Sequence, residues 1–255
     1  MLAPPDLSGG GGRFLRERTF AALTGRDRGG RLWVAPLVGP PGFLDGSGRT
    51  LRVAARPAAG DPLADLPAGQ AVGLIAMDFA RRRRMRVNGV ASSVGVDGLT
   101  IEVDQAFGNC PQYIHPRVVR AADIGPGGVP AVPGGRLGPD QVELIRRADT
   151  FFLGTSHPER GVDASHRGGP PGFVLATAGE LSWPDYPGNN LFNSLGNLAV
   201  DDSAALLFVD FRTGAVLHVS GAATVDWAAA GPTGRRVRLA VHQVQACGPH
   251  VPHLS

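Results

Sequence analysis

The sequence predicts a mainly β chain in which one small antiparallel barrel occurs twice in tandem. The first observation is an internal repeat: WVAPLVGPPGF at residues 33–43 returns as DASHRGGPPGF at residues 163–173, 130 positions later. Residues 61–79 return 132 positions later, and VNGV at residue 87 returns as VSGA at the same offset. The second observation is a series of short apolar runs between turn residues, typical of antiparallel barrels. A steady offset over three blocks indicates a duplicated domain.

Changes in composition divide the chain into five segments. The glycine-rich start is expected to be a flexible leader, and a stretch rich in Gly and Pro between the copies is expected to be a linker. The segments are residues 1–12 (leader), 13–122 (first copy), 123–139 (linker), 140–247 (second copy) and 248–255 (tail).

Helices are expected to be few. Residues 13–23 favour a short helix that leads into a strand, and its counterpart in the second copy begins at Asp140, with Glu143 completing a capping box. A further helix is expected at residues 193–200, inserted between strands, with an equivalent in the first copy.

Strands account for most of each copy. Residues 74–79 and 204–211 are apolar runs of strand length, and the second continues through a tight turn at residues 212–214 into a strand at residues 217–225. Apolar and polar residues alternate over residues 237–242, as in a half-buried strand.

Composition excludes several functions. The chain has no lysine, so all 25 basic residues are arginine, and neither a Schiff-base lysine nor a P-loop lysine is present. A net charge of +3 does not indicate a nucleic-acid partner. No apolar run approaches the ~20 residues of a membrane span, and no signal peptide is expected. Two separated cysteines, Cys110 and Cys247, form no disulfide framework and favour a cytoplasmic location.

Common cofactor and metal motifs are also absent. There is no HExxH, and no GxGxxG opens a helix after a strand, so neither a metal site nor a Rossmann site is expected. Cys110 is more simply explained as a structural residue than as a reactive thiol.

Four motifs of the second copy resemble one known family. They are SHRGG at residue 165, PGF at residue 171, NNLFNSLGNL at residue 189 and LFVDF at residue 207. Together they resemble the pyridoxamine 5′-phosphate oxidase-like FMN-binding split barrels, and GNCPQYIHPR at residue 108 resembles a motif of the two-copy members. The resemblance implies two split barrels that form a pseudo-dimer within the chain, with FMN between them. Such a chain is expected to be monomeric or to form a homodimer.

The second copy carries residues suited to the phosphate of FMN. Side chains on a strand edge precede two glycines that allow close backbone approach, and further donors surround the start of the inserted helix. Taken singly, the helix-start residues equally fit turn and capping roles. The candidates are Ser165, His166, Arg167, Asn190, Asn193, Ser194 and Asn197.

The first copy differs at the matching positions. Ala35, Pro36 and Leu37 replace the strand-edge set, while Asp61, Pro62 and Asp65 replace the helix donors. Carboxylates repel a phosphate, and proline removes a backbone donor. We therefore expect one phosphate site per chain, in the second copy.

Three residues after the first copy are expected near a cleft shared by both copies: Gln112, Tyr113 and Arg117. Ordinary packing explains Tyr113 equally well. The arginine run at residues 81–84 falls on the hairpin that matches residues 213–216, so most of it is expected to be solvated. Arg84 and Arg86 share one strand face and have the charge to meet an anion.

The expected function is FMN-dependent oxidoreduction of a small molecule by hydride transfer, with NAD(P)H as a candidate reductant. Two alternatives remain open: a flavin-binding protein without turnover, and a split barrel that uses deazaflavin or haem.

Overall fold

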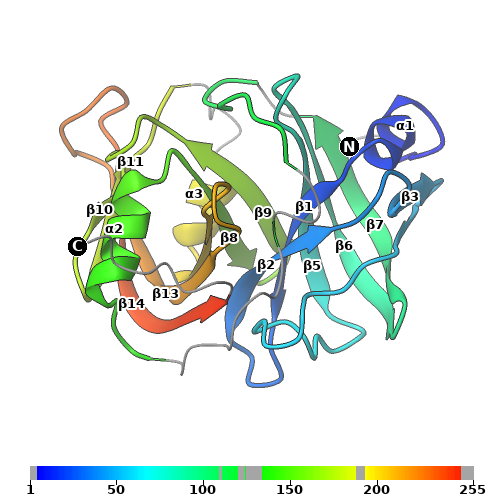
Figure 1. Cartoon of the computed structure of the whole chain (residues 1–255), viewed down its shortest axis with the longest axis horizontal. Helices are drawn as coiled ribbons and strands as arrows, with labels where there is room; N and C mark the ends of the chain where they lie inside the picture. Colours follow the sequence, from blue (N-terminus) through cyan, green and yellow to red (C-terminus); the bar gives the residue numbers. More distant parts are fainter. Residues whose placement is uncertain (1–4, 109–110, 120–123, 125–133, 188–192, 248–255) are drawn as a thin grey trace.

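The computed structural model describes residues 5–108, 111–119, 124, 134–187 and 193–247. The predicted fold class is confirmed: the chain is mainly β, with two seven-stranded antiparallel sheets, one for each copy. Figure 1 shows the two copies side by side, with β1, β2, β8 and β9 in the middle of the molecule.

The two sheets share one strand order. The first runs β2-β1-β5-β6-β7-β4-β3, and the second, read from β9, runs β9-β8-β12-β13-β14-β11-β10. The first contains β1 (Phe20–Arg26), β2 (Leu32–Val38), β3 (Leu44–Ser47), β4 (Thr50–Val53), β5 (Ala71–Asp78), β6 (Arg83–Gly95) and β7 (Gly98–Gly108). The second contains β8 (Thr150–His157), β9 (Gly161–Gly168), β10 (Leu175–Ala176), β11 (Glu180–Pro184), β12 (Ser203–Val209), β13 (Val216–Asp226) and β14 (Arg236–Cys247).

Strand register supports the repeat at the level of single residues. Leu23 of β1 lies opposite Ala35 of β2, and Leu153 of β8 lies opposite Ser165 of β9. Each copy also has a register shift at the same place, at Asn88/Gly89 in β6 and at Ser220/Gly221 in β13. The repeat therefore aligns the two copies as the sequence indicates.

The helices differ from the prediction. Helix α1 spans Gly10–Arg16, so it begins inside the expected leader, and Leu7 before it is buried and donates its amide to Gly48 O. The leader prediction is therefore wrong for residues 7–12. Gly12 there serves close packing, because a Cβ on it would lie 1.9 Å from Leu7 O.

Helix α2 spans Pro139–Arg147 and is not capped by Asp140. Its N-cap is Gly138, whose amide donates to Gln141 Oε1 at 2.9 Å, and Pro139 occupies the first helical position. Glu143 instead pairs with Arg147 one turn later, at 2.6 Å. The end of the predicted linker is also held in place, because Gly134 exchanges two backbone hydrogen bonds with Val244 of β14.

Helix α3 (Asn193–Leu198) is present in the second copy, but the expected equivalent in the first copy is a pair of turns. Pro62 and Pro67 interrupt that segment, and the Asp61 carboxylate accepts the amide of Leu63 at 2.8 Å. Such local side-chain bonds favour turns over helix.

Apolar packing joins the two copies. One buried cluster draws on both: Phe20, Val34, Ile75 and Phe79 from the first copy, and Phe152, Ala164 and Leu207 from the second. Its two sides are related by the repeat, since β5 packs on β9 and β12 packs on β2. The intrachain pseudo-dimer predicted from the sequence is therefore present.

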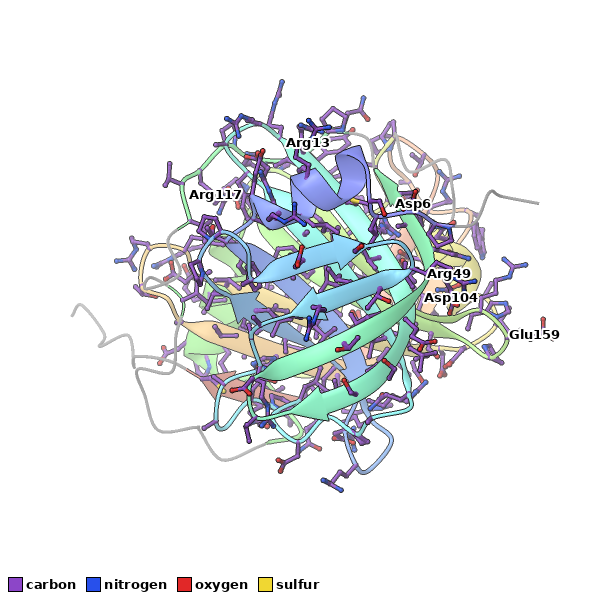
Figure 2. The ribbon with its side chains drawn as sticks, turned by 90° about the vertical axis from the view of Figure 1, so that its right-hand side faces the viewer. Asp6, Arg13, Arg49, Asp104, Arg117 and Glu159 are labelled. Atoms are coloured by element: carbon purple, nitrogen blue, oxygen red, sulfur yellow. The ribbon has the colours of Figure 1, made fainter. Side chains whose placement is uncertain are left out.

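Charged side chains lie around the outside of the first copy, as Figure 2 shows for Arg13, Arg49 and Asp104. Arg49 and Asp104 are 3.8 Å apart, and both are more than half exposed. Exposed pairs of this kind add little stability.

The contact between the copies is testable at Gly73 of β5, where a Cβ would lie 2.7 Å from backbone atoms of Asp163 and Ala164. Because a strand backbone cannot yield as a flexible side chain does, we expect Gly73→Ala to lower the free energy of unfolding by about 1–3 kcal/mol in urea denaturation. Gly95→Ala is the control, since a Cβ on Gly95 would have no other atom within 4 Å. Equal stability of the two variants would contradict this packing.

Candidate functional site

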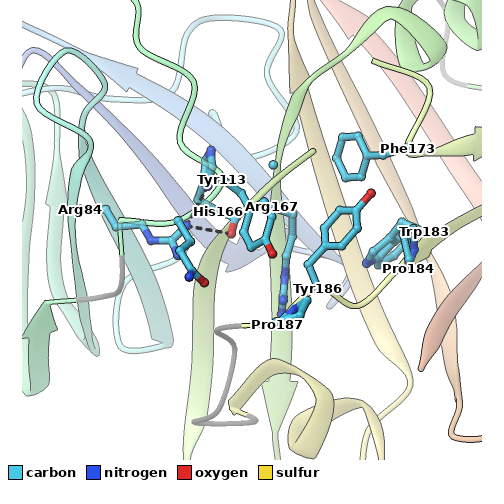
Figure 3. A pocket seen from close by; sticks show the side chains of 11 residues that line it. Arg84, Tyr113, His166, Arg167, Phe173, Trp183, Pro184, Tyr186 and Pro187 are labelled. Carbon is cyan, nitrogen blue, oxygen red and sulfur yellow. Dashed lines mark hydrogen bonds between the residues drawn. The ribbon is translucent and has the colours of Figure 1, made fainter. Parts of the chain in front are cut away.

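A pocket lies between the copies, beside the last residues of β9. His166, Arg167 and Gly168 of β9 line it together with Tyr186, which follows β11. The first copy contributes Arg84 of β6 and the segment with Gln112 and Tyr113. In Figure 3, Arg84 reaches across to His166, and Tyr113 and Tyr186 face each other near Arg167. Both copies therefore build the site.

His166 is a buried, neutral donor at neutral pH. Burial lowers the pKa of His166 well below 6.5, and the charges of Arg84, Arg117 and Arg167 lower it further. Arg84 Nη1 lies 2.7 Å from His166 Nδ1. Since a guanidinium only donates, Nδ1 accepts and the ring proton is on Nε2. His166 Nε2 is buried and has no hydrogen-bond partner among the described residues.

Arg167 is held along one edge only. Its Nη1 lies 3.6 Å from Asp185 Oδ1, while its Nε and Nη2 are buried without a hydrogen-bond partner in the described part of the chain. Burial lowers the pKa of Arg167 to about 10, the charge of Arg86 acts in the same direction, and Asp185 and Asp163 oppose both. Arg167 therefore stays charged at neutral pH.

A polar network lies behind the pocket and ties β9 to the first copy. Arg86 Nη1 donates to Asp163 Oδ2 at 2.7 Å, and Asn88 Nδ2 donates to the other carboxylate oxygen at 3.1 Å. Ser194 Oγ lies 3.4 Å from Asp163 Oδ2 and 3.2 Å from Ser165 Oγ. All five side chains are buried. Ser194 therefore faces a carboxylate, while Ser165 Oγ donates to Leu153 O at 3.3 Å. That either serine meets a phosphate stays a prediction.

The remaining sequence candidates are spread around this network. Arg117 forms two bonds to the Asp149 carboxylate, at 2.6 and 2.7 Å, and stacks over Phe211. It is not part of the pocket lining, but its charge lowers the pKa of His166. Asn197 donates to Thr155 at 3.0 Å, away from the pocket lining. Asn193 starts α3 and is half-buried.

Gln112 is exposed at the pocket mouth. Asn190 and Cys110 lie outside the described residues.

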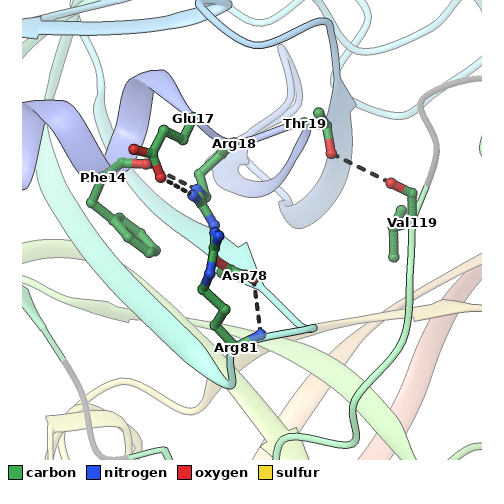
Figure 4. A network of polar contacts seen from close by, with 7 residues as sticks. All are labelled: Phe14, Glu17, Arg18, Thr19, Asp78, Arg81 and Val119. Carbon is green, nitrogen blue, oxygen red and sulfur yellow. Dashed lines mark hydrogen bonds and ion pairs between the residues drawn. The ribbon is translucent and has the colours of Figure 1, made fainter.

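A second network fixes the turn that carries the arginine run (Figure 4). Arg18 pairs with the buried Asp78 at the end of β5 and donates to Phe14 O at 2.9 Å, and the Asp78 carboxylate accepts the amide of Arg81 at 3.0 Å. Burial would raise the pKa of Asp78, but the bonds from Arg81 and Arg18 outweigh it and lower that pKa. Arg81 to Arg83 are exposed, as expected, while Arg84 is set against His166.

The matching position of the first copy is closed. His218 corresponds to Arg86, and its Nδ1 donates to Val34 O at 2.8 Å. Its Nε2 lies 3.5 Å from Asp61 Oδ2, and Trp33 packs against its ring in place of Asp163. Burial raises the pKa of Asp61, and His218 partly opposes this. A buried carboxylate thus faces a histidine here, whereas the equivalent position beside the pocket holds the ion pair of Arg86 and Asp163.

Sequence reasoning missed Asp163, Asp185 and Tyr186. The sequence did contain a signal for Asp163, because the repeat aligns this residue with Trp33. A charged residue in one copy and an apolar one in the other indicates that the two copies differ in function. Asp185 and Tyr186 lie in SWPDYP, which falls outside the repeated sequence blocks and so gave no signal.

Comparison with known proteins shows similarity to solved structures only. No protein-family model matches the chain, and no curated protein matches it significantly. A single-residue variant of HupZ from Group A Streptococcus is 13% identical, with 43% of this chain and 98% of that chain covered and a TM-score of 0.35. A candidate pyridoxamine 5′-phosphate oxidase from Lactobacillus delbrueckii is 17% identical, with coverages of 44% and 94% and a TM-score of 0.35.

A FAD-binding protein from Mycobacterium smegmatis is 12% identical, covers 45% of this chain and 96% of its own, and has a TM-score of 0.30. Each of these proteins aligns with about half of this chain. At such identities and scores, the comparisons assign neither a ligand nor a site residue.

The described residues contain no helix long and apolar enough to cross a membrane. They also contain no group of three or more His, Cys, Asp or Glu side chains placed to hold a metal ion.

The charge balance of the pocket is testable at Asp185, which is buried and also accepts from Arg235 Nε at 2.9 Å. Asp185→Asn leaves two guanidinium groups without this carboxylate, so we expect a loss of about 3 kcal/mol in unfolding free energy. Since the removed charge repels anions, phosphate should stabilise the variant more than the natural protein. Urea unfolding in chloride and in phosphate at matched ionic strength measures both effects.

Glu180→Gln is the control for this experiment, because Glu180 pairs with Arg238 at 3.4 Å and both side chains are about half exposed. Its expected loss is below about 1 kcal/mol, with no special response to phosphate. A similar phosphate response in both variants would contradict the charge balance described here.

Proposed function

We propose that the chain binds a flavin, specifically FMN, between its two copies and acts as an oxidoreductase on a small molecule. The proposal combines the resemblance of the sequence to FMN-binding split barrels with the chemistry of the pocket. The cationic side of the pocket lies next to aromatic walls, and this arrangement suits a planar ring that carries a phosphate.

One observation carries the proposal: three buried N–H donors beside the pocket have no partner among the described residues. They are Arg167 Nε, Arg167 Nη2 and His166 Nε2. An unsatisfied buried donor costs about 1–3 kcal/mol, and more when it is charged. Phosphate oxygens supply several acceptors to such donors at once, and a guanidinium matches them in geometry.

The residues fit the phosphate end of FMN better than they fit its ring. Free space in the pocket is about 40 Å³, far below the roughly 300–1,000 Å³ of ligand pockets. Tyr113 and Tyr186 fill the space, with ring centroids 5.0 Å apart. A flavin ring therefore requires these two side chains to separate.

The residues of the chain have binding roles in this proposal. Arg167 and His166 hold the anionic group, Arg84 fixes the His166 ring, and Tyr186 and Phe173 contact the aromatic part. His166 stays neutral, so it acts as a hydrogen-bond donor and not as an acid near pH 7. When bound, a flavin supplies the hydride chemistry itself.

Arg167→Ala tests the proposal directly. The variant loses two charge-assisted donors, each worth about 1.5–3 kcal/mol, so we expect FMN to bind at least about 100-fold more weakly in a fluorescence titration. Arg160→Ala is the control, because Arg160 is an exposed arginine in the turn before β9. Circular dichroism checks that both variants fold. Equal affinity in the two variants would contradict the assigned role of Arg167.

The absorbance spectrum of the loaded protein separates the alternatives. Flavin bands that bleach with NADH or NADPH, and return in air, support an oxidoreductase. Flavin bands that no reductant changes support a binding protein without turnover. A deazaflavin spectrum or a Soret band in the purified protein would overturn the assignment of FMN.

A further inference from the structure

The stacked tyrosine pair combines one residue from each copy. Tyr113 follows β7 of the first copy, and Tyr186 follows β11 of the second. The ring planes lie within 19° of parallel, and Tyr113 is 39% exposed. Neither hydroxyl has a hydrogen-bond partner among the described side chains and backbone groups. Stacking alone therefore holds the two rings together, at about 0.5–1.5 kcal/mol.

The backbone at Tyr113 opposes this arrangement. Tyr113 has φ of +62°, in the left-handed region that only glycine enters without cost. For other residues this conformation costs about 1–3 kcal/mol, which is comparable to the free energy gained from the tyrosine stack. The strained residue is also seated closely, because a Cβ on Gly168 would lie 1.9 Å from Tyr113 O. The backbone of Tyr113 is thus fixed against Gly168, while only the weak stack holds its ring over Tyr186.

We propose that Tyr186 is the platform of an aromatic subsite and that Tyr113 is its cover, which the planar ring of an anionic ligand displaces. The acidic group of that ligand meets Arg167 and His166, while its ring stacks on Tyr186 in the place of Tyr113. One stack replaces another, so displacement costs little. This deepens the proposed function, because it names aromatic phosphates and carboxylates as the ligand class and explains how a nearly full pocket takes a ring.

Two probes of different shape test the subsite. 1-Naphthyl phosphate carries a planar ring, so it binds only if the Tyr113 ring moves. Inorganic phosphate has no ring and needs only Arg167 and His166. Calorimetric titrations compare the natural protein with Tyr113→Gly, which removes the ring and relieves the backbone strain, and with Tyr186→Ala, which removes the platform. Tyr113→Phe is the matched control, since it keeps both the ring and the strain.

We expect Tyr113→Gly to bind 1-naphthyl phosphate about tenfold more tightly and Tyr186→Ala to bind it about tenfold more weakly. Tyr113→Phe should match the natural protein, and the affinity for inorganic phosphate should be the same in all four proteins. Unchanged or weaker binding of 1-naphthyl phosphate by Tyr113→Gly overturns the proposal, because Tyr113 would then be a wall of the subsite. Failure of every variant to bind this probe overturns it as well.

A spectroscopic measurement follows the cover itself. The chain has only two tyrosines, so 3-fluorotyrosine labelling gives one ¹⁹F resonance for each member of the pair. Both resonances should move with 1-naphthyl phosphate, and neither should move comparably with inorganic phosphate. FMN serves as a separate probe. If 1-naphthyl phosphate behaves as expected and FMN does not bind, the flavin function fails while the aromatic subsite stands.

Discussion

The contact between the two copies is the constraint on which the rest of the structure depends. Strands β5 and β9 pack against each other, as do β12 and β2, so that the buried faces of two similar sheets form one apolar cluster. The strands approach so closely that Gly73 has no room for a side chain. Because of this contact, Arg84 and Arg86 from the first copy reach β9 of the second. Without it, neither half would hold a complete pocket.

Duplication within one chain also allows the two equivalent positions to differ. In an assembly of identical barrels, any change at one site appears at both. Here Arg86 and Asp163 form a buried ion pair on one side, while His218 and Trp33 occupy the matching positions on the other. One side thus gathers Arg84, Arg117 and Arg167 around His166, and the other sets His218 beside the buried Asp61. Under the proposed function, this asymmetry gives the chain a single anion site.

The sequence predicted the fold more fully than it predicted the site. Alternation, turn residues and the repeat indicated the strands and their equivalence, because these are local patterns. Helix starts were less predictable from the sequence. The amide of Gly138 donates to Gln141, and Leu7 is buried before α1. Neither feature shows in the local pattern of apolar and polar residues. Among the site residues, Arg167, His166 and Tyr113 line the pocket. Ser194 instead contacts Asp163, whose partner Arg86 is 77 residues away.

The central claim is that one chain has one flavin site, built by both copies. Calorimetric titration of the intact protein with FMN tests it most directly through the stoichiometry. The account predicts one FMN bound per chain, whether the protein is monomeric or dimeric. Two FMN per chain would contradict it by showing that the first copy holds a site of its own, and one FMN per two chains would show that the pocket within a single chain is not the binding unit.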